Sequence, residues 1–204
     1  MITLGLTGSI GMGKSTAAQQ LRQMGLPVFE ADAAVHELYQ SAEIREQIRA
    51  ILPPEYRGES FNRNLVARAV LIYPELLKKL EGILHPQVRA MEQEFLYRAR
   101  EQAHRIAILD IPLLFETGEE SRCDYIAVVT APKLIQAWRV LRRPGMSLHK
   151  LNIILSRQMG DAEKRSRADF VVHTGFGKWV SGLQWKNILK RLMHSAISSS
   201  NAQN

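Results

Sequence analysis

A glycine-rich segment near the N-terminus constrains this chain more than any other feature. Residues 8–15 read Gly-Ser-Ile-Gly-Met-Gly-Lys-Ser and fit the pattern G-x-x-x-x-G-K-[ST]. They lie between an apolar run, Ile2 to Leu6, and a segment with helical periodicity, Lys14 to Met24. A glycine-rich turn between a strand and a helix directs backbone N–H groups and the helix N-terminus toward phosphate oxygens. The segment therefore predicts a phosphate loop and, with it, a nucleotide site.

Each position of the phosphate loop has an expected task. We expect the backbone of Gly8, Gly11, Met12 and Gly13 to surround the phosphates and Lys14 to reach the β- and γ-phosphates. The Ser15 hydroxyl is expected to ligate Mg²⁺, and Thr16 to donate to the α-phosphate. The alternative is a glycine-rich turn with a surface lysine. Neither N-K-x-D nor D-x-x-G, which guanine-specific switches carry, occurs in the chain.

The order of apolar and periodic segments predicts the fold class α/β. Short apolar strands that alternate with helices indicate a parallel sheet with helices on both faces. Residues 33–104 are rich in helical pattern and read as an insertion between two strands. The last helix carries an apolar stripe of Trp185, Ile188, Leu189 and Leu192. The predicted strands are Ile2–Leu6, Pro27–Glu30, Arg105–Asp110, Tyr125–Thr130 and Asp169–His173, and the predicted helices are 14–24, 33–52, one or two within 62–84, 86–104, 133–142 and 147–159.

The positive charge is concentrated in one segment. The net charge is +7, and the stretch from Lys133 to Arg167 holds nine basic and two acidic residues, so that it carries the whole excess. Concentrated charge favours a single anionic site, with a helix that has one solvated basic face as the alternative. The chain has one cysteine, Cys123, which excludes a disulfide framework and a multi-cysteine metal site. The absence of a signal peptide and of a long apolar segment predicts a cytoplasmic protein with no membrane partner.

Two aspartates follow predicted strands, where ligands bind in open α/β sheets. Asp32 follows the second strand and is a candidate to accept a proton from a substrate hydroxyl, with a helix N-cap as its alternative role. Asp110 ends the strand before Pro112 and is a candidate to orient water on Mg²⁺, with a helix cap as its alternative. An unpaired carboxylate in an apolar strand is costly, which favours the metal role.

The chain resembles the dephospho-coenzyme A kinase family of phosphate-loop kinases from Leu4 to about Gly175. The phosphate loop is shared with many enzymes, whereas the segment from Leu109 to Glu116 together with Leu84-His85-Pro86 is more particular to this family. The matching pieces are Gly5–Thr16, Ala31-Asp32, Leu84-His85-Pro86 with Arg89, Leu109–Glu116, and Lys164-Arg165 with Arg167-Ala168-Asp169.

This resemblance implies ATP-dependent phosphorylation of the ribose 3′-hydroxyl of dephospho-coenzyme A, the last step of coenzyme A biosynthesis. It implies a fold of the P-loop NTP hydrolase type with a helical substrate-binding insertion and a lid. The expected division is a nucleotide-binding core of residues 1–32 and 105–194, a lid at about 139–160, an insertion of residues 33–104 and a disordered tail of residues 195–204. The oligomeric state stays open between a monomer and a weak oligomer.

The resemblance also assigns roles to particular side chains. Asp32 matches the general base, and Arg139 and Arg143 match lid arginines that meet the ATP phosphates. The residues implied on the substrate side are Asp32, His85, Arg89, Leu113 and Phe115. For His85, a turn residue or a satisfied core histidine is the alternative.

The chain departs from the usual family pattern at several positions. Glu30 stands where aspartate is common, and the turn His173-Thr174-Gly175 replaces one that often contains asparagine near the adenine. Asn62-Arg63 and Tyr73-Pro74 replace pairs that usually begin with aspartate.

Two rival functions remain. One is a kinase of another small acceptor, such as a nucleoside or a nucleoside monophosphate. The other is a nucleic-acid-binding ATP switch that uses the basic segment. The basic segment has little aromatic interleaving and no groove-reading motif, so nucleic acid is not an expected partner.

Overall fold

A computed structural model describes residues 1–57 and 61–201, with side chains to residue 194. The chain divides into two compact units. Unit 1 consists of Met1–Phe29 and Arg98–Asn204, and unit 2 consists of Glu30–Tyr97. Because a single segment supplies unit 2, it is an insertion in the sequence of unit 1.

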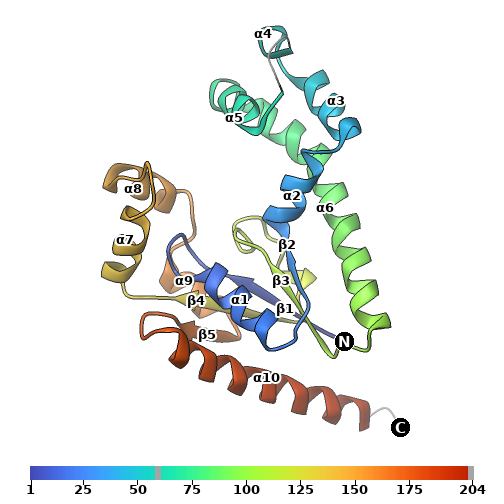
Figure 1. Ribbon diagram of the computed structural model, residues 1–204, viewed down its shortest axis with the longest axis vertical. Coiled ribbons are helices and arrows are strands. Elements are labelled where there is room, and N and C mark those ends of the chain that lie inside the picture. Colours follow the sequence, from blue (N-terminus) through green and yellow to red (C-terminus); the bar gives the residue numbers. More distant parts are fainter. Residues whose placement is uncertain (58–60, 202–204) are drawn as a thin grey trace. The chain divides into compact units, whose positions relative to one another are not determined.

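Unit 1 is built on a parallel sheet whose five strands follow the order β2-β3-β1-β4-β5 (Figure 1). The strands are β1 (Ile2–Thr7), β2 (Val28–Glu30), β3 (Ile106–Asp110), β4 (Tyr125–Thr130) and β5 (Phe170–His173). In the sheet register Leu6 lies beside Asp110, Thr7 beside Val128, and Thr130 beside His173. The carboxyl ends of β3, β1, β4 and β5 therefore share one edge, and the segments that follow them are neighbours there.

Helices cover unit 1 because the strands are apolar on both faces. The helices of this unit are α1 (Lys14–Gln23), α7 (Lys133–Leu141), α8 (Leu148–Ser156), α9 (Asp161–Arg167) and α10 (Lys178–Asn201), with a 3-10 turn, η1 (Glu120–Arg122). On one face, α1 and α10 pack side by side against the strands (Figure 1). The apolar stripe of the last helix is confirmed, since Trp185, Ile188, Leu189 and Leu192 are all buried in this core.

Unit 2 is helical. It contains α2 (Ala31–Leu38), α3 (Ala42–Ile51), α4 (Pro54–Arg57), α5 (Arg63–Ile72) and most of α6 (Glu75–Glu101). The Asn62 side chain caps α5 by accepting the Leu65 N–H at 2.9 Å, which satisfies one free amide of the first turn. Phe61 stacks on Tyr39 and receives the Arg49 guanidinium over its ring.

The boundaries of several elements differ from the sequence-based expectation. The predicted helix 33–52 is two helices: the first ends at Leu38 with Tyr39 as its C-cap, and Ser41, in an extended conformation, is the N-cap of the second. Helix α6 continues through Pro86, where two separate helices were expected. Neither α9 nor η1 was expected. Helix α10 continues to Asn201, into the stretch 195–204 expected to be disordered, and no glycine or proline after Gly182 interrupts it.

Candidate active site

The phosphate loop forms a tight turn between β1 and α1. Gly11 and Gly13 have φ angles of +77° and +93°, in the left-handed region that favours glycine. The Met12 N–H donates to the Ser9 carbonyl at 3.1 Å and closes the turn, and Gly13 is the N-cap of α1. The helix N-terminus thus stands directly behind the loop, which favours a bound anion at this place.

The glycines of the loop also allow neighbouring segments to approach closely. A Cβ on Gly8 would lie 2.6 Å from Val129 Cγ2, and one on Gly11 would lie 2.6 Å from Val140 Cγ2. The loop is therefore packed directly against β4 and α7. Met12 is buried, and its N–H and carbonyl are bonded to the Ser9 carbonyl and the Thr174 hydroxyl.

Lys14 and Asp110 form an ion pair at the edge of the sheet. The Lys14 Nζ lies 2.6 Å from Asp110 Oδ1, and the Asp110 side chain is only 3% exposed. Asp110 closes β3 beside Leu6 in the register, which brings its carboxylate to the first turn of α1. The pair holds the Lys14 ammonium at the mouth of the loop. The segment that follows Asp110 and contains Pro112 forms turns and begins no helix, so Asp110 does not cap a helix there.

Arg139 extends from α7 over the phosphate loop. Its guanidinium donates to Thr174 Oγ1 at 2.9 Å and to the Thr174 carbonyl at 2.8 Å. The Thr174 hydroxyl in turn donates to the Met12 carbonyl at 2.7 Å. Arg139, Thr174 and the loop are thereby one hydrogen-bonded assembly.

Comparisons with known proteins identify the family. The dephospho-CoA kinase family model matches residues 2–176. The chain is 53% identical over 174 residues to the dephospho-CoA kinase of Brucella melitensis, a match that covers 85% of this chain and 86% of that protein. It is 47% identical over 190 residues to the dephospho-CoA kinase of Rhodopseudomonas palustris, covering 93% of this chain and 95% of that protein. The chain belongs to the dephospho-CoA kinase family.

Solved structures share the fold. A Thermus thermophilus protein of known crystal structure superposes with a TM-score of 0.79 at 34% identity and covers 94% of this chain and 97% of its own. A dephospho-CoA kinase from Campylobacter jejuni superposes with a TM-score of 0.63 at 21% identity, over 93% of this chain and 96% of its own, which supports the fold. The expected fold of a P-loop kinase is confirmed, and the chain is a phosphotransferase.

In this kinase the basic segment has more than one use. Arg143 is exposed just after α7, whereas the basic residues of α9 are engaged within the protein. Lys164 is fully buried with its Nζ 2.8 Å from Glu116 Oε1, an ion pair whose geometry falls short of a hydrogen bond. Arg165 pairs with Asp161, and Arg167 pairs with Glu120. Part of the charge excess therefore stabilises unit 1 instead of facing a ligand.

Leu113 and Phe115 differ in their exposure. Leu113 is 40% exposed, whereas Phe115 is buried beneath the Arg167 guanidinium, which lies 4.9 Å from its ring centroid. Of the two, Leu113 offers the larger surface to a ligand. Sequence alone does not distinguish them, because both are apolar residues in one short motif.

Ser15, Thr16 and Asp32 lie in the first turns of two helices of this kinase. Ser15 is exposed and Thr16 is half-buried in the first turn of α1. Asp32 is an exposed residue in the first turn of α2, whose N-cap is Glu30, so Asp32 is not an N-cap. Its carboxylate stands at the solvent-facing side of the helix start.

His85 and Arg89 line an open groove of about 390 Å³ along α6 in unit 2, together with Glu81, Gly82 and Pro86. Both side chains are exposed, so His85 is neither a turn residue nor a core histidine. Pro86 has no N–H, so it makes no helical hydrogen bond to the carbonyl of Gly82, four residues before it.

No helix in the described part of the chain is long and apolar enough to span a membrane.

Proposed function

We propose that this protein transfers the γ-phosphoryl group of ATP to the ribose 3′-hydroxyl of dephospho-coenzyme A, which yields coenzyme A and ADP. The observation that carries this proposal is the Lys14–Asp110 pair at the mouth of the phosphate loop, in a chain of the dephospho-CoA kinase family. A lysine held there can stay in contact with the β- and γ-phosphates and neutralise the charge that develops on them during transfer.

The nucleotide side of the proposed reaction lies in unit 1. Backbone amides at Gly8, Gly11, Met12 and Gly13 and the first turn of α1 bind the phosphates, with Thr16 at the α-phosphate. Arg139 and Arg143 neutralise charge on the transferring group. Residues 139–160 act as a lid that excludes water and so protects ATP from hydrolysis.

The residues at the loop suit a magnesium ion. The Ser15 hydroxyl and the Asp110 carboxylate supply hard oxygen ligands on adjacent segments, and Mg²⁺ combines such ligands with water and substrate phosphates. We propose direct ligation by Ser15 and a water-mediated contact to Asp110. When bound, Mg²⁺ neutralises charge on the β- and γ-phosphate oxygens.

The acceptor side of the proposed reaction involves the insertion of residues 33–104. His85, Arg89, Leu113 and Phe115 are assigned to substrate binding. Asp32 takes the proton of the 3′-hydroxyl while that oxygen forms a bond to the γ-phosphorus. The bond from this phosphorus to the bridging β–γ oxygen breaks, and ADP leaves with the electron pair. Because ATP is the donor, we propose that the reaction takes place in the cytoplasm.

The acceptor can be tested directly. The purified protein is incubated with ATP, Mg²⁺ and one acceptor at a time, and ADP release is coupled to NADH oxidation. Dephospho-coenzyme A should be turned over at least about a hundredfold faster than nucleosides or nucleoside monophosphates. Equal or faster turnover of a nucleoside would contradict the proposal and favour the small-acceptor rival. Turnover that depends on added RNA or DNA would favour the nucleic-acid rival.

A further inference from the structure

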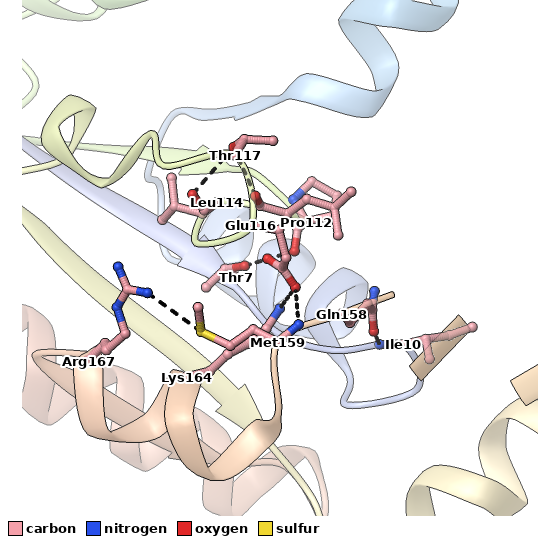
Figure 2. Close-up of polar contacts among 11 residues, drawn as sticks. Thr7, Ile10, Pro112, Leu114, Glu116, Thr117, Gln158, Met159, Lys164 and Arg167 are labelled. Carbon is pink, nitrogen blue, oxygen red and sulfur yellow. Dashed lines mark hydrogen bonds and ion pairs between the residues drawn. The ribbon is translucent and has the colours of Figure 1, made fainter. Parts of the chain in front are cut away.

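Ile10, in the phosphate loop, is bound on both of its backbone polar groups by glutamine side chains. The Gln136 amide donates to the Ile10 carbonyl at 2.8 Å. The Ile10 N–H donates to Gln158 Oε1 at 3.1 Å (Figure 2). Gln136 lies just before the proposed lid, and Gln158 lies near its end. The loop is therefore tied to both flanks of the segment that is proposed to close over it.

A buried ion pair fixes the segment that carries Gln158. The Met159 N–H donates to Glu116 Oε1 at 2.9 Å, and the same oxygen lies 2.8 Å from the Lys164 Nζ (Figure 2). The Lys164 side chain is fully buried and that of Glu116 is 15% exposed. Removing one partner would leave a charge without compensation in the interior, so the pair keeps Glu116 in place, and Glu116 in turn accepts the backbone N–H next to Gln158.

We infer that Gln158 is a positioning residue for nucleotide binding, and that Glu116 and Lys164 act through it. Gln158 accepts the Ile10 N–H of the loop, and the Glu116–Lys164 pair fixes the backbone next to Gln158. These contacts hold the following loop amides, those of residues 11–13, in one arrangement. A preformed set of amides binds phosphate more tightly because less ordering accompanies binding. This inference rests on the proposed function only for the identity of the nucleotide.

The first test replaces Gln158 by leucine, which has a similar shape and no acceptor. Titration calorimetry with ADP as the probe should show about three- to tenfold weaker binding, the range expected for one lost hydrogen bond. In turnover assays the KM for ATP should rise similarly, while the KM for dephospho-coenzyme A stays within about twofold. Gln102→Leu makes the same change at an exposed position of unit 1 and should leave both values unchanged. Wild-type ADP affinity in Gln158→Leu overturns the inference.

The second test asks whether the buried pair acts through Gln158. Glu116→Gln with Lys164→Met removes both charges, leaves the net charge unchanged and keeps an acceptor for Met159. This double variant should weaken ADP binding about twofold or more by loosening the segment, and it should weaken it no further when Gln158 is already leucine. A full additional loss in that background means that the pair acts by another route and overturns that part of the inference. If the double variant does not fold by circular dichroism, Glu116→Gln alone, which keeps an acceptor for Met159, takes its place in both backgrounds, and the same outcomes decide.

These outcomes separate the inference from the proposed function. ADP binding requires no acceptor, so it reports on Gln158 whatever the acceptor is. Suppose that the wild-type protein binds ADP, that Gln158→Leu weakens this binding, and that the wild-type protein does not phosphorylate dephospho-coenzyme A. The positioning role of Gln158 is then supported and the proposed acceptor is wrong.

Discussion

At the scale of the residue, the Lys14–Asp110 pair and the exposed Asp32 differ in what holds them. Lys14 is fixed by the carboxylate of Asp110, whose side chain is 3% exposed. The register of β1 and β3 sets the position of Asp110, because it places this residue beside Leu6. Asp32 is fixed only by its position in the first turn of α2, with its side chain exposed. A residue of this kind suits proton transfer, because its carboxylate can approach a hydroxyl without first breaking a buried contact.

Asp32→Asn should lower kcat by about 10²- to 10⁴-fold, because the amide keeps the shape and loses the basic oxygen. The KM for ATP should stay within about threefold. The measurement is the coupled assay with dephospho-coenzyme A, and Glu37→Gln, at an exposed acidic position on the same helix, is the matched control. Near-normal turnover in Asp32→Asn removes the general-base assignment.

At the scale of the element, the turn after β5 is joined to the phosphate loop and to α7 by one side chain. The Thr174 hydroxyl accepts from Arg139 and donates to the Met12 carbonyl. Its Oγ1 would lie 2.9 Å from a Cβ on Gly13, so the close approach also explains a glycine in the loop. A hydroxyl can accept and donate at once, so one Thr174 side chain makes both contacts.

Thr174→Val should lower kcat/KM for ATP by about tenfold or more, because valine has a similar volume but lacks the hydroxyl that accepts from Arg139 and donates to the Met12 carbonyl; Arg139 keeps its bond to the carbonyl of residue 174. Thr174→Ser keeps the hydroxyl and should stay within about threefold of the wild type. Steady-state kinetics at varied ATP concentration check both variants. A loss of the same size in Thr174→Ser would mean that packing of the methyl group, and not the hydroxyl, matters here.

The elements that sequence could predict are those with a local cause. The phosphate loop, the apolar strands and the start of the helix predicted from residue 147, where Ser147 accepts the Lys150 N–H, each depend on a few adjacent residues. The burial of Lys164 could not be predicted, because its partner Glu116 is 48 positions away and a basic residue is normally exposed. The course of α6 through Pro86 could not be predicted either, since proline usually ends a helix.

The contact between Tyr73 and Glu55 should make the stability of unit 2 depend on pH. The Tyr73 hydroxyl donates to Glu55 Oε1 at 2.6 Å, and this hydrogen bond lowers the pKa of Glu55 and raises the pKa of Tyr73. A lowered carboxyl pKa contributes stability above the ordinary glutamate value of about 4.3, which is lost as the pH falls through the folded value. A raised phenol pKa contributes stability below about 10, which is lost as the pH rises through the folded value.

Tyr73→Phe should therefore cause a small decrease in melting temperature that is constant from about pH 5 to 9 and disappears below about pH 4. The decrease is small because both groups are exposed. Thermal unfolding followed by circular dichroism across this range measures it, and NMR titration should show the Glu55 pKa returning toward its ordinary value. A decrease that persists unchanged at pH 3 would show that the hydrogen bond is not its source.

At the scale of the whole molecule, the residues proposed for the nucleotide all lie in unit 1, whereas those proposed for the acceptor are divided between the two units. The phosphate loop, Asp110, Arg139, Arg143 and Thr174 lie in unit 1, as do Leu113 and Phe115 among the acceptor residues, whereas Asp32, His85 and Arg89 lie in unit 2. Within unit 1 the basic residues also differ in what they contact. Arg139 contacts the phosphate loop, whereas the basic residues of α9 form ion pairs with Glu116, Asp161 and Glu120. Net charge alone therefore does not measure the strength of the anion site.

Hydrogen exchange should show this division directly. A non-hydrolysable ATP analogue with Mg²⁺ should slow amide exchange at least about tenfold in residues 8–16, which supply the N–H groups proposed to bind phosphate, and should also protect the residues near Arg139, Gln158 and Thr174. Dephospho-coenzyme A should instead protect the region of Asp32 and the α6 groove at His85 and Arg89. Lys14→Ala should lose the first protection and keep the second, because Lys14 lies only in the nucleotide site. Protection of the α6 groove by the ATP analogue alone would place the nucleotide on the insertion and reverse the assignment of the two units.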